Sequence, residues 1–178
     1  MNSLTDKYTL INSVEVPCIA FGTWKMPEEV AANAVKCAIE SGYRHIDTAA
    51  AYQNEEYVGK GIRESGVKRD EIFLVSKLPN DDHGYQNAID SCERSLKRLK
   101  TDYLDSYLIH WPVLVENVDR LEDDLCETWR AFEKLYNDGK LRSIGTSNFL
   151  EEHIEIIKRN FSTYPMINQV QMHPQNPQ

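Results

Sequence analysis

The stretch CIAFGTWK (18–25) decides between the two folds that the rest of the sequence allows. It joins an apolar run of strand length to Gly22-Thr23-Trp24-Lys25. An open dinucleotide-binding sheet is expected to carry G-x-G-x-x-G directly after its first strand, because those glycines let the backbone approach a pyrophosphate. No such glycine triplet stands here, and this favours a (β/α)8 barrel over the open sheet.

Short apolar runs alternate with amphipathic stretches along the chain. The runs are strand-sized and bounded by turn residues, and they lie at 18–22, 43–46, 72–76, 103–110, 141–145 and 166–172. Helical periodicity is clearest at 30–39, 88–99 and 121–135. Strand–helix repetition at this spacing predicts βαβ units and a parallel sheet. The preceding YTLINSVEVP (8–17) predicts a small hairpin that turns at Asn12-Ser13.

The length of the chain bounds the number of these units. A full (β/α)8 TIM barrel takes about 250 residues, whereas this sequence has 178. We therefore predict one α/β domain over residues 1–178, an incomplete barrel of about six βα units that lacks the last two. Such a sheet has an unpaired strand at each edge, so self-association is a further expectation.

The charge and the cysteines of the sequence indicate which partners and which cellular compartment to expect. The formal net charge of -8 disfavours nucleic acid and anionic membranes, because both reward clustered Lys and Arg. The four cysteines are widely spaced and form no CxxC or zinc pattern, which predicts free thiols, no metal and a cytoplasmic protein. The first residues lack the charged and apolar regions of a signal peptide.

Polar residues stand where the predicted strands end, and in a parallel barrel those ends form the catalytic face. Asp47 and Tyr52 follow the second run, Lys77 the third and His110 ends the fourth. Each residue alone has a structural explanation, such as a helix cap or a satisfied polar group. The convergence of all four on one rim instead predicts an acid–base site.

These four residues suit proton donation to a carbonyl. A tyrosine with a pKa of about 10 is a poor acid at neutral pH, and we expect the Lys77 ammonium to lower the pKa of Tyr52. Asp47 would hold Lys77 through an ion pair, and His110 would orient the carbonyl oxygen. The rim shows no Ser-His-Asp arrangement and no reactive cysteine. The hydride must then come from a cofactor.

Two further residues admit two interpretations. Ser147 and Asn148 end the fifth run directly before FLEEHIEII (149–157). They are either the N-cap of a helix or functional groups at the rim, and the two roles are compatible.

Several stretches resemble the aldo-keto reductase family over nearly the whole chain. GYRHIDTAAAYQNEEYVG (42–59) is similar to the first signature of that family, and KLRSIGTSNF (140–149) to a later one. IFLVSKL (72–78) and LDSYLIHWP (104–112) place Lys77 and His110 at its catalytic positions. PMINQVQMHP (165–174) looks like its sixth strand.

The resemblance implies NADPH-dependent reduction of small aldehydes or ketones to alcohols, with a small-molecule carbonyl as the partner. Tyr52 would be the general acid, tuned by Lys77 and Asp47, and His110 would orient the carbonyl. NADPH rather than NADH rests on the habit of the family alone. The cofactor would be held by Thr23, Trp24, Asp47, Ser147, Asn148 and Gln169, the last three on the nicotinamide carboxamide. Trp24, Tyr52, His110 and Trp111 would contact the substrate.

Two alternatives remain open from the sequence. Trp24 and Trp111 are either core residues or walls of the pocket, and their places just past strand ends favour walls. In the family, strands seven and eight grip the pyrophosphate and the 2′-phosphate of the cofactor. The alternative function is therefore a catalytically impaired barrel fragment, or a regulatory or interaction module similar to the potassium-channel β subunits.

Overall fold

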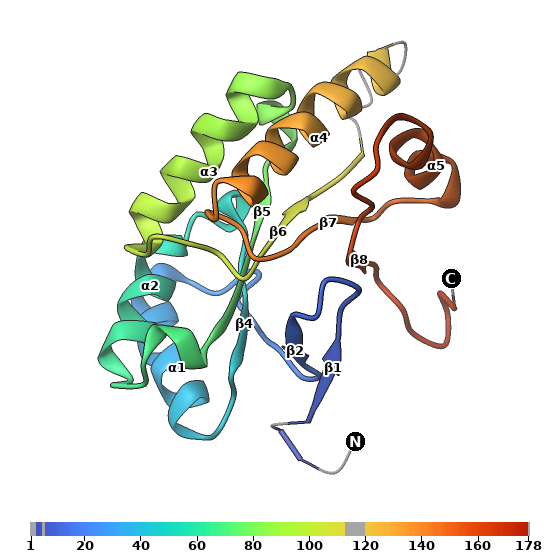
Figure 1. Cartoon of the computed structure of the whole chain (residues 1–178). Coiled ribbons are helices and arrows are strands. Elements are labelled where there is room, and N and C mark those ends of the chain that lie inside the picture. The colour runs from blue at the N-terminus through green and yellow to red at the C-terminus, as the bar shows by residue number, and fades with distance from the viewer. Residues whose placement is uncertain (1–2, 5, 113–119, 178) are drawn as a thin grey trace.

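The computed structural model describes residues 3–4, 6–112 and 120–177. In this part of the chain, six parallel strands form one curled sheet (Figure 1) in the order β3 (Phe21–Gly22), β4 (His45–Asp47), β5 (Phe73–Leu78), β6 (Ser106–Ile109), β7 (Ile144–Ser147) and β8 (Asn168–Gln169). Strands β1 (Lys7–Thr9) and β2 (Glu15–Pro17) form an antiparallel hairpin. The predicted α/β fold of barrel type, with its N-terminal hairpin, is confirmed.

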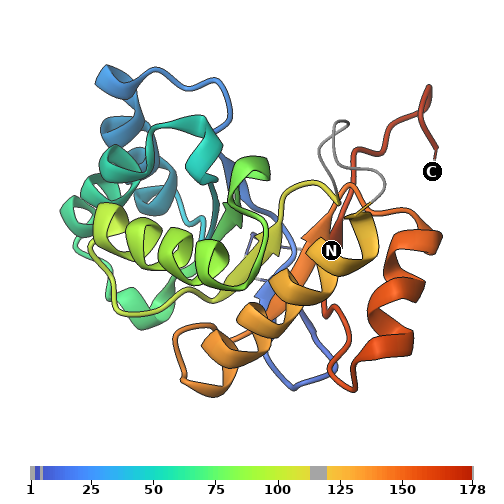
Figure 2. The ribbon, with the colours of Figure 1, turned by 90° about the horizontal axis from the view of Figure 1, so that it is seen from above.

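The helices pack on the outer side of this sheet, and the view from above shows them in an arc around it (Figure 2). Their bounds are α1 (Glu28–Glu40), α2 (Glu55–Glu64), α3 (Tyr85–Leu99), α4 (Leu121–Asn137) and α5 (Glu151–Asn160). Short 3-10 turns occur at η1 (Ala50–Tyr52), η2 (Arg69–Glu71) and η3 (Asn80–Asp82). No helix among the described residues is long and apolar enough to cross a membrane.

Side-chain alternation along the strands decides which residues reach the inner face. In β5, Leu74 and Leu78 belong to the large buried cluster beneath the helices, whereas Phe73 and Val75 pack on the other side with Leu108 of β6. Leu10 and Val16 of the hairpin segment complete that inner cluster. Because successive side chains of a strand point to opposite faces, Lys77 shares the inner face with Phe73 and Val75.

Helix α2 follows Tyr52 closely and is held tightly between its neighbours. A Cβ added to Gly59 would collide with the Leu99 carbonyl at the end of α3, and one added to Gly61 would collide with the Ala32 carbonyl of α1. These glycines therefore permit a close approach of backbones. That approach fixes where α2 starts, and with it the turn that carries Tyr52.

Candidate active site

An ion pair between Asp47 and Lys77 lies at the C-terminal ends of β4 and β5. Lys77 Nζ donates to Asp47 Oδ1 at 2.6 Å and to the Thr48 carbonyl at 3.0 Å, and its side chain is 1% exposed. Burial lowers the pKa of Lys77, and the Asp47 carboxylate opposes that shift. The pair is therefore a buried charge held in place by its counter-ion.

Tyr52 lies in the η1 turn, with its hydroxyl 3.4 Å from Lys77 Nζ. Its ring meets the His110 ring edge-to-face, with 5.7 Å between centroids. Burial, followed by the Asp47 carboxylate, raises the pKa of Tyr52 to about 12. The predicted lowering of this pKa is wrong, because the phenol is partly desolvated and the Asp47 carboxylate also disfavours a second negative charge.

His110 follows β6 and faces the same site. Burial and the nearby Lys77 ammonium lower its pKa to about 4. The imidazole is therefore neutral at pH 7 and offers one N–H donor. The His110 carbonyl accepts a hydrogen bond from Asn148 Nδ2 at 2.9 Å, which ties the end of β6 to the end of β7.

The residues predicted to hold a nicotinamide lie at the ends of β7 and β8. Ser147 Oγ donates to the Gln169 carbonyl at 2.9 Å, and Gln169 Nε2 donates to Asp47 Oδ2 at 2.9 Å. This second contact joins the end of β8 to the end of β4 across the open sheet, and it was not predicted from the sequence. Asn148 has a left-handed backbone, with φ of 61°. Through Gln169 the ends of β7 and β8 are joined to Asp47, and their hydroxyl and amide groups offer both donors and acceptors.

The helix-cap interpretation of Ser147 and Asn148 is wrong. Helix α5 begins at Glu151 with Leu150 as its N-cap, and no side chain caps it there. Instead, His153 Nδ1 accepts a hydrogen bond from the Leu150 N–H. Ser147 and Asn148 direct their side chains to β8 and β6.

The two tryptophans predicted as walls of the pocket are not core residues. Trp24 is 67% exposed and Trp111 is 48% exposed. Thr23, by contrast, is fully buried, and its hydroxyl donates to Thr48 Oγ1 at 2.9 Å and also lies 3.2 Å from the Asp47 carbonyl. Thr23 therefore meets the site from beneath, and Trp111 lies beside His110 at the surface.

A groove of about 720 Å³ opens beside His110 and Trp111. Its other walls come from the η1 turn, the η3 turn and helix α3, and they include Gln53, Asn80 and Arg98. Most of these lining side chains are polar. The groove could therefore receive a small polar molecule next to the His110 imidazole.

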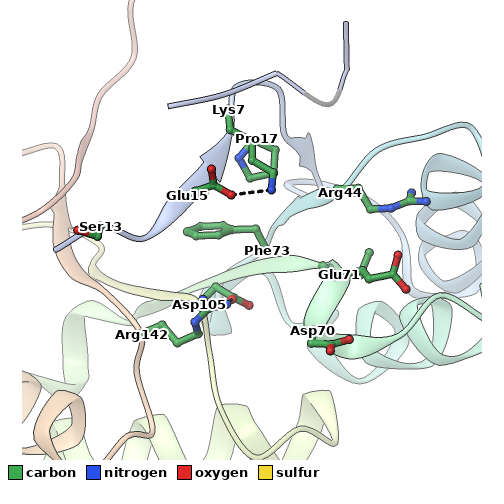
Figure 3. Close-up of a pocket in the computed structure, with 11 residues that line it drawn as sticks. Lys7, Ser13, Glu15, Pro17, Arg44, Asp70, Glu71, Phe73, Asp105 and Arg142 are labelled. Carbon is green, nitrogen blue, oxygen red and sulfur yellow. Dashed lines mark hydrogen bonds and ion pairs between the residues drawn. The ribbon is translucent and has the colours of Figure 1, made fainter. Parts of the chain in front are cut away.

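A second pocket of similar volume lies at the other ends of the strands (Figure 3). Phe73 and Asp105 line it from the starts of β5 and β6, and Glu15 borders it from the hairpin. Asp105 is 1% exposed and pairs with Arg69 at 2.8 Å and Arg142 at 2.7 Å. This pocket contains none of the predicted site residues, and such N-terminal faces of barrels serve stability.

Two buried residues beneath the site were missed from the sequence. Thr48 and Asn54 are fully buried, and Thr48 Oγ1 donates to Asn54 Oδ1 at 3.2 Å. Their place just after Asp47 and Tyr52 was the only available signal. Among the described residues, no group of three or more His, Cys, Asp or Glu side chains is placed to hold a metal ion.

Comparisons with known proteins agree on one family. The model of the Aldo/keto reductase family matches residues 18–178. The glyoxal reductase of Bacillus subtilis (strain 168) is 50% identical over 173 residues, which cover 97% of this chain and 60% of that protein. The 9,11-endoperoxide prostaglandin H2 reductase of Trypanosoma cruzi (strain CL Brener) is 46% identical, over 98% of this chain and 59% of that protein.

Solved structures give the same result. An aldo/keto reductase from Brucella melitensis superimposes with a TM-score of 0.90 at 43% identity, covering 98% of this chain and 66% of that one. A Bombyx mori aldo-keto reductase in complex with NADP also gives 0.90, at 37% identity, covering 99% and 61%. The chain thus spans about 60% of the length of the curated relatives.

Proposed function

The chain belongs to the aldo/keto reductase family, and from that premise we propose that it reduces small aldehydes and ketones to alcohols with NADPH. The observation that carries the proposal is the buried Lys77 ammonium, which contacts both the Asp47 carboxylate and the Tyr52 hydroxyl. The hydroxyl can supply the proton, and the ammonium and the neutral imidazole of His110 can stabilise and orient the oxygen, while the hydride would come from the cofactor.

In this mechanism Tyr52 gives its proton to the carbonyl oxygen. Its raised pKa, about 12, keeps the hydroxyl protonated at neutral pH but makes it a weak acid, so the transfer depends on stabilisation of the anion that forms. The tyrosinate that forms lies within reach of the Lys77 ammonium, which stabilises the new negative charge. Asp47 holds Lys77 in position, and the neutral His110 donates a hydrogen bond that orients the carbonyl oxygen.

The proposed cofactor site uses Trp24, Asp47, Ser147, Asn148 and Gln169, with Thr23 beneath. A bound nicotinamide supplies the hydride that reduces the carbonyl carbon. The polar side chains at the ends of β7 and β8 fit a carboxamide, because they offer both donors and acceptors. The choice of NADPH is supported by the Bombyx mori neighbour, which was solved with NADP.

The proposed substrates are small carbonyl compounds, including 1,2-dicarbonyls. The groove beside His110 and Trp111 supports this choice through its polar walls. A second support is the similarity to a protein named glyoxal reductase. Trp24 and Trp111 would provide the apolar part of the substrate contact.

The test is NADPH oxidation by the purified protein with a panel that includes glyoxal, simple aldehydes and ketones. Tyr52→Phe should abolish turnover and retain cofactor binding, because only the hydroxyl is removed. The matched control is Tyr85→Phe, which changes an exposed tyrosine on α3 and should keep the wild-type rate. The proposal is wrong if no carbonyl on the panel is reduced, or if Tyr52→Phe keeps the full rate.

A further inference from the structure

Asn54 stands at the N-cap of α2 yet does not cap the helix. Asparagine is among the preferred residues at that position, where its side-chain oxygen accepts from a backbone N–H of the first turn. Here the structure gives Asn54 no side-chain cap bond, and the residue is 0% exposed. Its side chain must therefore satisfy its hydrogen bonds elsewhere.

The Asn54 amide bonds to two other segments of the chain. Its Nδ2 donates to the Thr23 carbonyl at 2.9 Å and to the Met26 carbonyl at 3.2 Å. Its Oδ1 accepts from Thr48 Oγ1 at 3.2 Å, and Thr48 Oγ1 in turn accepts from Thr23 Oγ1 at 2.9 Å. Thr23 and Thr48 are also fully buried, so water does not compete for these bonds.

The joined segments are those that carry the proposed chemistry. Thr23 and Met26 flank Trp24, so their carbonyls anchor the loop with the exposed tryptophan. Thr48 follows Asp47, and its own carbonyl accepts from Lys77 Nζ at 3.0 Å. Asn54 itself closes the turn that holds Tyr52. One buried amide therefore links the positions of the proposed proton donor, its ammonium partner and the loop that carries Trp24.

We infer that Asn54 is a positioning residue for Tyr52 and Lys77, acting through Thr48 and Thr23. The inference rests on the proposed function. The distance from Lys77 Nζ to the Tyr52 hydroxyl is already 3.4 Å, near the upper limit of a hydrogen bond. A small displacement of the η1 turn breaks this contact, and misplacement by about 1 Å costs an enzyme up to about 100-fold in rate.

The first experiment separates positioning from stability. Asn54→Ala should lower kcat at least about tenfold and change the KM for the carbonyl much less. Thr48→Val, which removes only the hydroxyl link, should give a smaller loss in kcat. The control is Ser143→Ala, which removes one buried hydrogen bond, to the Asp105 carbonyl, at the opposite ends of the strands. It should lower the melting temperature and leave kcat unchanged.

The second experiment does not need activity. Hydrogen exchange of the protein without cofactor should be faster in Asn54→Ala over 23–26 and 47–54, and unchanged in α4. Unchanged exchange in those two segments overturns the inference, as does a wild-type kcat in a folded Asn54→Ala protein. If the wild type reduces no carbonyl, the proposed function is rejected. Faster exchange of Asn54→Ala over 23–26 and 47–54 would then still support the positioning role.

Discussion

Lys77 Nζ lies 2.6 Å from Asp47 Oδ1, and the two side chains are only 1% and 11% exposed. A buried charge of this kind is strongly unfavourable unless a counter-ion and further hydrogen bonds surround it. Asp47 receives such a bond from Gln169 on β8. The pair therefore serves both stability and the proposed chemistry. The contacts that allow Lys77 to be buried also place its ammonium beside the Tyr52 hydroxyl.

Removing one member of this pair should destabilise the fold. Lys77→Met leaves the Asp47 carboxylate buried without its counter-ion, so the free energy of unfolding should fall by about 3–5 kcal/mol. The double variant with Asp47→Asn should lose less than the sum of the two single losses, because no uncompensated charge remains. Urea titrations of the four proteins measure this coupling.

The control for that cycle is Lys60→Met, which removes an exposed ion pair with Glu64 on α2. Its effect should stay within about 0.5 kcal/mol. Single losses for Lys77 and Asp47 that simply add would contradict the coupling.

The pH dependence of stability should carry a contribution from His110. Its pKa in the folded protein is about 4, below the value of about 6.5 for an unfolded histidine. Below pH 6.5 the unfolded chain therefore binds a proton that the folded protein does not, and stability is lost as the pH falls from about 6.5 toward 4. Above that window the contribution is complete.

His110→Gln should remove this contribution, so its free energy of unfolding should fall less steeply than that of the wild type between pH 6.5 and pH 4. Burial also lowers the pKa of His45 and His83, but both residues are present in both proteins and their effects cancel in the comparison. Identical slopes for the two proteins would show that His110 titrates normally in the folded state.

The pocket of Figure 3 should matter for stability and not for turnover. Asp105→Asn weakens the contacts to Arg69 and Arg142 and should cost about 2 kcal/mol of unfolding free energy, since it removes charged hydrogen bonds. The kcat/KM for an aldehyde should stay at the wild-type value. A loss of turnover in a folded Asp105→Asn protein would point to chemistry at that end of the sheet.

Most of the strands could be predicted from the sequence, because short apolar runs indicate strands and the polar residues after them indicate where the strands end. The strands β4, β5 and β7 each extend past the predicted run, into Asp47, Lys77 and Ser147. Helix α2 was not predicted. Its two glycines weaken the helical preference, and its place is decided by close packing against α1 and α3.

The properties that depend on distance and burial could not be read from residue types. The sequence placed an ammonium near Tyr52, but the sign of the pKa shift follows first from burial of the phenol and then from the nearby Asp47 carboxylate. The sequence also pointed to Thr23 as a pocket residue, whereas its hydroxyl lies in a buried network with Thr48. Such networks join residues far apart in the chain and leave no periodic signal.

The most direct test of the account follows the hydride itself. Glyoxal should be reduced with NADPH that is dideuterated at C4 of the nicotinamide, and the alcohol analysed by mass spectrometry. We predict a product with a single deuterium on the former carbonyl carbon in the wild type, and no such product from Tyr52→Phe. An alcohol that carries no deuterium, or equal yields from the two proteins, would contradict the assignment of carbonyl reduction with Tyr52 as the proton donor.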